Sequence, residues 1–134
     1  MSIGLDTSVI VHLLVGEPKQ QALAAHRFLD EMKTAGQGPV LVSELVISEA
    51  FFALRHHYAV PAAAALQALK ALSNDERIRA TPAALRVLAT PNLATAKPGF
   101  LDRLIHGHYL ESGVGMATFD KAAGRLPDTR VLTI

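Results

Sequence analysis

Short apolar segments alternate along this chain with longer segments of helical periodicity, and this alternation limits the folds available to it. The apolar segments are rich in β-branched residues, which favour strands, and turn residues bound them. Strands separated by helices are joined by crossover connections, which make neighbouring strands parallel. We therefore expect an α/β protein, a three-layer α/β/α sandwich with a central, mostly parallel sheet of four to five strands.

Local signals place the boundaries of these elements. Ser43 is a good helix cap, Thr81 followed by Pro82 marks another helix start, and the Gly16-Glu17-Pro18 sequence interrupts a helix. The pattern predicts strands at residues 2–6, 40–42, 77–80, 115–118 and 130–133, and helices at residues 7–14, 19–34, 44–58, 61–72, 82–90 and 98–111.

Length and composition narrow the class of protein. The 134 residues suit one domain, residues 1–134, and half of them are hydrophobic, so a large core is expected. No apolar run approaches the ~20 residues of a membrane span. Cysteine is absent, which excludes disulfides and thiolate metal sites. With no leader pattern at the start, we expect a cytoplasmic protein. The net charge of +1 lacks the strong basic signature of a dedicated nucleic-acid binder.

A single acid, Asp6, lies at the end of the first predicted strand. A carboxylate there is unfavourable unless a helix N-terminus, an arginine or a metal ion compensates it. Two interpretations are open on this segment alone. Asp6 is either an N-cap for the following helix or a metal ligand, and the hydroxyls of Thr7 and Ser8 suit both roles.

Three more acids differ from ordinary surface charges. Glu49 lies within an almost apolar helix, on a helical face with Leu45 and Phe52, so we expect it to point toward the core. Asp120 follows a predicted strand directly, as Asp6 does. Asp102 is in the first turn of its helix, where a carboxylate is favoured for structural reasons too.

Ligands of open parallel sheets bind beyond the carboxyl ends of the strands, so these four acids can gather there. Without a cation they would repel one another, whereas Mg²⁺ or Mn²⁺ would make them an all-oxygen metal site. Such a site polarises a phosphodiester and activates water for its hydrolysis. Four unrelated acids remain the alternative, since spacing alone does not exclude it.

The ordered set of motifs resembles the PIN-domain ribonucleases, and among them the VapC toxins of bacterial toxin–antitoxin pairs. The motifs are Leu5-Asp-Thr-Ser8, Val42-Ser43 with Glu49, Asp102-x-Leu-Ile105 and Thr118-Phe-Asp120, and they cover nearly the whole chain. Ser8 stands where asparagine is frequent in such proteins. A second departure is the sequence His106-Gly-His108-Tyr109, where small residues are common.

The resemblance implies a Mg²⁺- or Mn²⁺-dependent endoribonuclease that inhibits translation as a toxin, forms a homodimer and is blocked by an antitoxin protein. It implies metal ligation by Asp6, Glu49, Asp102 and Asp120, with Thr7, Ser8 and Thr118 around them. Candidate RNA contacts are Lys97, Arg103, His106, Lys121 and Arg125. The apolar content of residues 19–34 and 61–72 suggests the dimer contact.

Alternatives remain at the level of sequence. His106 is either an RNA contact or, more simply, a structurally satisfied residue, and the basic residues suit ordinary surface charge equally well. A receiver-like phosphoacceptor domain would also place acids at strand ends, but it needs a second acid near the first strand. A degenerate, non-catalytic interaction domain is the third option. Aromatic residues make up 5% of the chain, and the sequence suggests no stacking platform for bases.

Overall fold

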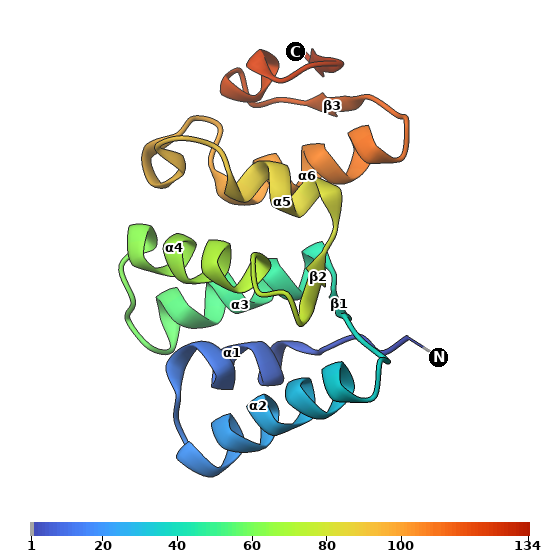
Figure 1. The fold of residues 1–134 in the computed structure, drawn as a ribbon. Helices are drawn as coiled ribbons and strands as arrows, with labels where there is room; N and C mark the ends of the chain where they lie inside the picture. The colour runs from blue at the N-terminus through green and yellow to red at the C-terminus, as the bar shows by residue number, and fades with distance from the viewer. Residues whose placement is uncertain (1) are drawn as a thin grey trace. The chain divides into compact units, whose positions relative to one another are not determined.

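The structure is a computed structural model that describes residues 2–134, and it contains two compact units. The first unit extends to Thr81 and the second comprises Pro82–Ile134. In Figure 1 the first unit runs from blue to yellow-green and the second from yellow to red.

The first unit contains two strands and four helices: α1 (Thr7–Val15), α2 (Lys19–Thr34), β1 (Val40–Val42), α3 (Glu44–His56), α4 (Ala62–Ser73) and β2 (Ile78–Ala80). These bounds confirm the predicted helices and the two later strands of this unit. β1 pairs in parallel with β2, with Val40 opposite Ile78. The helices α3 and α4 form the crossover between these two strands, as the alternating pattern predicts.

Residues 3–5 differ slightly from the strand predicted at residues 2–6. They pair in parallel with β1 through a bridge between Gly4 and Leu41. The Leu5 N–H donates to the Leu41 carbonyl at 2.9 Å, and the Leu41 N–H donates to the Ile3 carbonyl at 2.8 Å. The pairing stops there because Asp6 already forms the cap of α1. Residues 3–5 therefore add a short strand-like segment beside β1.

Helix caps follow the signals in the sequence. The Ser43 hydroxyl accepts the Val46 N–H at 3.3 Å at the start of α3. α1 ends at Gly16, whose φ of +78° is a left-handed conformation that glycine adopts without strain. These local interactions explain why the predicted boundaries agree closely with the observed ones.

The core of the first unit lies where its helices meet the strands. α1 packs against both α2 and α3, and α3 packs against α4 (Figure 1). The largest fully buried side chains here are Ile10, Leu29, Val40, Ile47 and Leu69. α4 uses its buried face, including Leu66 and Leu69, inside this unit, so the alanine-rich segment forms part of the core.

The predicted orientation of Glu49 was wrong. The buried face of α3 consists of Ile47, Ala50 and Leu54. Glu49 is exposed, as are Leu45 and Phe52 on its own face. The helix is apolar on nearly every side, so a helical wheel cannot identify which side packs against the neighbouring elements.

The second unit contains a helix pair and a pair of strands. Its elements are α5 (Pro82–Leu88), the 3₁₀ turn η1 (Leu93–Thr95), α6 (Phe100–Glu111), β3 (Met116–Thr118), the 3₁₀ turn η2 (Ala122–Arg125) and β4 (Thr129–Val131). β3 pairs in parallel with β4, with Met116 opposite Thr129. The last strand thus begins one residue earlier than predicted.

α5 and α6 pack closely in this unit. A Cβ atom at Gly107 would lie 3.3 Å from the Ala83 Cβ, so glycine permits the close approach of the two helices. The Glu111 carboxylate accepts the Ala83 N–H at 2.9 Å and so satisfies an N–H in the first turn of α5. This contact orients α5 antiparallel to α6, with the end of α5 near the start of α6.

The structure confirms parallel strand pairing with helical connections. A continuous sheet of four to five strands stays a prediction, because each unit contributes short parallel pairs. Across residues 2–134, no helix has both the length and the apolar character that crossing a bilayer requires.

Candidate functional site

Asp6 is held in a defined position at the N-terminus of α1. Its backbone is extended, and its Oδ1 accepts the Val9 N–H at 3.3 Å and the Ser8 hydroxyl at 2.7 Å. The Ser8 hydroxyl, followed by the Val9 N–H, lowers the pKa of the Asp6 carboxyl below its ordinary value. Both of these bonds end on Oδ1, and the Ser8 backbone N–H makes a smaller contribution to the lower pKa. The residue is thus a cap and also an ionised, exposed carboxylate.

A hydrogen bond connects the neighbourhood of Asp6 to Glu49. The Thr7 hydroxyl, in the first turn of α1, donates to Glu49 Oε1 of α3 at 3.3 Å. The packing of α1 on α3 brings these residues together although 42 positions separate them. The first unit therefore places two of the four predicted acids on adjoining helices.

Asp6 also borders a cleft of the first unit. The cleft has a volume of about 650 Å³ and lies between residues 3–6, α1 and α2. Its wall includes Ser8 and His12 from α1, and Ala24 and Phe28 from α2. The carboxylate is therefore reachable from solvent beside a surface hollow.

The second unit carries the other two acids. Asp102 lies exposed in the first turn of α6, and Asp120 lies exposed two residues after β3. The Asp120 Oδ1 accepts the Ala122 N–H at 2.9 Å, while the Asp120 N–H donates to the Thr118 hydroxyl at 3.0 Å. Thr118 thus fixes the backbone at Asp120. α6 packs on β3, the strand that precedes Asp120.

The chemistry of these side chains suits Mg²⁺ or Mn²⁺, since all four supply carboxylate oxygens and Asp6 is held ionised. Over residues 2–134, neither unit contains three His, Asp or Glu side chains that lie close enough together to hold a metal ion. The metal centre therefore remains a prediction.

His106 has a structural environment. Its ring is buried, and Nε2 lies 2.7 Å from the Pro127 carbonyl, to which it donates. This bond ties α6 to the segment before β4, which favours the structural interpretation of His106. Arg103 is half-buried, and its Nε donates to the Pro98 carbonyl at 2.7 Å. The remaining basic candidates, Lys97, Lys121 and Arg125, are exposed.

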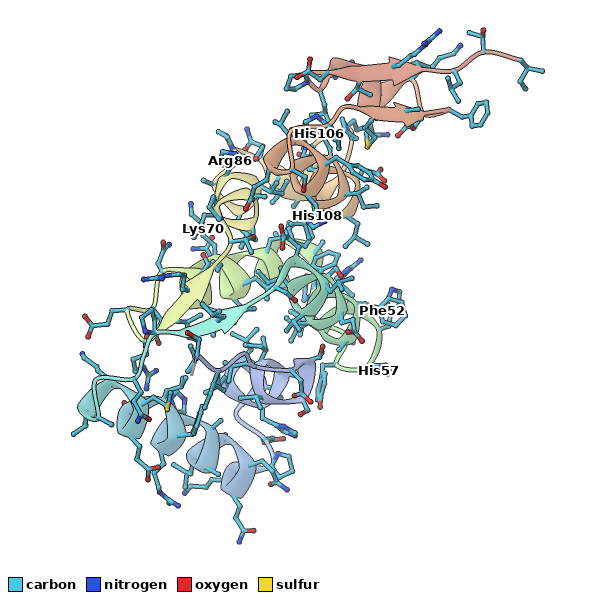
Figure 2. All side chains as sticks on the ribbon, turned by 90° about the vertical axis from the view of Figure 1, so that its right-hand side faces the viewer. Phe52, His57, Lys70, Arg86, His106 and His108 are labelled. Carbon is cyan, nitrogen blue, oxygen red and sulfur yellow. The ribbon has the colours of Figure 1, made fainter. Side chains whose placement is uncertain are left out.

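One pair of residues was missed by the sequence reasoning. Phe52 and His56 lie on the exposed side of α3, with ring centroids 4.3 Å apart and an interplanar angle of 39°. Figure 2 shows Phe52 projecting outward from α3. Their spacing of four residues on a predicted helix was the signal that could have identified the pair.

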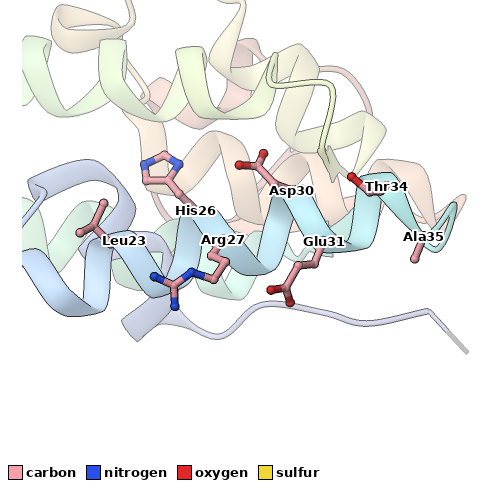
Figure 3. A pocket seen from close by; sticks show the side chains of 7 residues that line it. All are labelled: Leu23, His26, Arg27, Asp30, Glu31, Thr34 and Ala35. Carbon is pink, nitrogen blue, oxygen red and sulfur yellow. The ribbon is translucent and has the colours of Figure 1, made fainter.

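A second hollow of the first unit lies on α2 and holds none of the predicted site residues (Figure 3). It has a volume of about 610 Å³ and includes His26, Arg27 and Asp30. Asp30 accepts a hydrogen bond from Arg77 at 2.9 Å, and Asp75 accepts others from the same guanidinium. The hydrogen bonds from Arg77 lower the pKa of Asp75, as expected for an ion pair that supports the fold.

A model of the PIN domain matches residues 3–128, which cover most of both units and contain all four predicted acids. Neither a curated protein nor a solved structure matches the chain. The chain belongs to the PIN domain family, whose members are generally nucleases with a three-layer α/β/α fold and usually use divalent metal ions.

Proposed function

We propose that this protein is a Mg²⁺- or Mn²⁺-dependent endoribonuclease that hydrolyses RNA phosphodiester bonds. The observation that carries the proposal is the arrangement at Asp6. Its carboxylate is held ionised by Ser8 and is linked through Thr7 to the helix that bears Glu49. A cap of α1 does not require the contact from Thr7 to Glu49.

In this proposal the metal ligands are Asp6, Glu49, Asp102 and Asp120. The ion would stabilise the negative charge that develops on the phosphate and would lower the pKa of the attacking water. The surrounding residues orient the carboxylates. Ser8 fixes Asp6, Thr7 holds Glu49, and Thr118 together with the Ala122 N–H fixes Asp120. Pre-oriented ligands reduce the reorganisation that binding an ion would otherwise require.

The proposed RNA contacts lie close in sequence to the second pair of acids. In the sequence, Arg103 follows Asp102 and Lys121 follows Asp120. Lys97 and Arg125 complete the set. His106 is not part of it, because its ring is buried and its Nε2 is committed to Pro127. Cationic side chains near the acids would offset the repulsion between the carboxylates and the RNA backbone.

The motifs support a narrower assignment. We infer that the protein is the toxin of a toxin–antitoxin pair, acts in the cytoplasm to inhibit translation, and is neutralised by a cognate antitoxin. It would act as a homodimer. Of the two helices considered for the dimer contact, α2 is the better candidate, because Leu23 is exposed there while the apolar face of α4 is used inside its unit.

The test is cleavage of a mixture of structured RNAs by the purified protein with Mg²⁺ or Mn²⁺, with and without EDTA. Asp6→Asn is the test variant, and Asp128→Asn is the matched control, because Asp128 is an exposed acid outside the proposed site. We expect metal-dependent cleavage that Asp6→Asn lowers by on the order of 100-fold or more and that the control retains. Absent cleavage, or cleavage that persists in EDTA and in Asp6→Asn, would contradict the proposal.

A second variant separates a ligand role from a structural role. Asp102→Asn should abolish cleavage and leave the melting temperature of the metal-free protein unchanged or higher, because it removes repulsion between nearby carboxylates. A large fall in melting temperature would instead assign Asp102 to the start of α6.

The toxin assignment has its own test. Induced expression in bacterial cells should stop growth and amino-acid incorporation, and Asp6→Asn should relieve both effects. A small protein encoded beside this chain should restore growth when it is co-expressed. Normal growth despite active ribonuclease in the extract would contradict the toxin role and leave the enzymatic proposal intact.

A further inference from the structure

An aromatic pair lies exposed on the surface of α3. The Phe52 side chain is 53% exposed, and its ring centroid is 4.3 Å from that of His56. The His57 ring meets the Phe52 ring edge-on at a centroid distance of 6.1 Å. The side of α3 that packs inside the unit carries Ile47, Ala50 and Leu54, so Phe52 contributes little to the core.

The pair shares its face of α3 with Glu49. Residues 49, 52 and 56 are separated by three and four positions, which places them along one side of the helix. Phe52 therefore lies one turn beyond Glu49. A substrate whose phosphate is held near Glu49 would bring the adjoining nucleotide over this part of the helix.

The charges around the pair suit a polyanion. Residues 50–74 contain no Asp or Glu, whereas Arg55 and the imidazoles of His56 and His57 follow Phe52 closely in the sequence. The Arg55 guanidinium donates to the Val60 carbonyl at 3.0 Å, which holds this cation at the end of α3. The fixed positive charge of Arg55, three positions after Phe52 on the same helix, is complementary to the phosphates of RNA.

We propose that Phe52 and His56 form a stacking platform for an unpaired base of the RNA substrate, next to Glu49. The proposal rests on the ribonuclease function proposed above and names a part of the substrate that the protein holds. Aromatic rings accept any base because every base has a π-face, so the platform selects an unpaired nucleotide without selecting its sequence. A base in a duplex is already stacked on both sides and cannot occupy it.

The chain contains no tryptophan, which makes a direct test available. In Phe52→Trp the introduced indole is the single tryptophan, and stacking of a base on it quenches its fluorescence. Binding is measured in EDTA, so the RNA stays intact. The probes are a single-stranded oligonucleotide and the same sequence as a duplex. Leu85→Trp, at an exposed position of α5, is the control.

We expect strong quenching of Phe52→Trp by the single strand, weak quenching by the duplex, and weak quenching of Leu85→Trp by both. In steady-state cleavage, Phe52→Leu should raise KM about ten-fold and leave kcat within about two-fold, while Phe52→Tyr should restore KM, as expected for the loss of one stacked base.

Three results would overturn the proposal. Single-stranded RNA that leaves Phe52→Trp unquenched, or quenches Leu85→Trp equally, excludes a base at this position. A Phe52→Leu variant that changes from dimer to monomer in sedimentation, with KM unchanged, would show that the pair covers another protein chain. Because quenching is measured in EDTA, loss of the metal-dependent function alone would leave this test unaffected.

Discussion

The hydroxyl of Thr7 donates a hydrogen bond to Oε1 of Glu49 at 3.3 Å, and so joins the start of α1 to the middle of α3. This bond places a carboxylate of one helix beside the residue that follows Asp6.

Thr7→Val should lower the cleavage rate and the affinity for Mn²⁺ about ten-fold, because Glu49 loses the donor that orients it. The melting temperature should barely change, since the bond is exposed and valine keeps the shape of threonine. Cleavage kinetics and calorimetric titration with Mn²⁺ measure the two effects. Thr7→Ser keeps the hydroxyl and should keep both values near those of the parent protein. A fully active Thr7→Val would remove Thr7 from the site.

Ser8→Ala tests the pKa of Asp6. The Ser8 hydroxyl stabilises the ionised carboxylate, so its loss should raise the pKa of Asp6 toward the ordinary value. A metal binds the ionised form and competes with the proton. The affinity for Mn²⁺, measured between about pH 4 and pH 7, falls as the pH is lowered. In this variant the fall should therefore occur at higher pH. Ser8→Thr is the control, and an unchanged pH dependence in Ser8→Ala would contradict this role of Ser8.

Glu49 and Glu44 form a matched pair on the same helix. Glu49→Gln should reduce cleavage by on the order of 100-fold or more, because a neutral amide is a poor ligand for a hard cation. Glu44→Gln, in the first turn of α3, should leave the rate within about two-fold. Both variants are assayed for cleavage and melting temperature. If Glu44→Gln abolishes activity and Glu49→Gln does not, the wrong glutamate has been assigned to the metal.

His106→Ala should lower the free energy of unfolding by about 2–3 kcal/mol, because it creates a void and leaves the Pro127 carbonyl without its donor. Urea denaturation measures the change. The exposed His108→Ala should cost less than about 0.5 kcal/mol. If His106→Ala leaves the stability unchanged and raises KM, the structural role is contradicted and His106 contacts the RNA.

The sequence by itself determined the secondary structure and the kinds of side chain at the candidate site. The helix at residues 19–34 and the strand at residues 40–42 were predicted with the bounds that the structure has. Caps, prolines, glycines and hydrophobic periodicity are local, so they act in any tertiary context. The bond between Ser8 and Asp6 is also local, and the two residues were grouped from sequence alone.

Only the tertiary structure decided which faces pack and which distant residues meet. α3 is apolar on most sides, so packing against α1 and α4 selected Ile47, Ala50 and Leu54 for the core and left Glu49 and Phe52 exposed. The bonds from Thr7 to Glu49 and from His106 to Pro127 span 42 and 21 positions. No local signal encodes such contacts, because they form only when the packing of whole elements brings their backbones together.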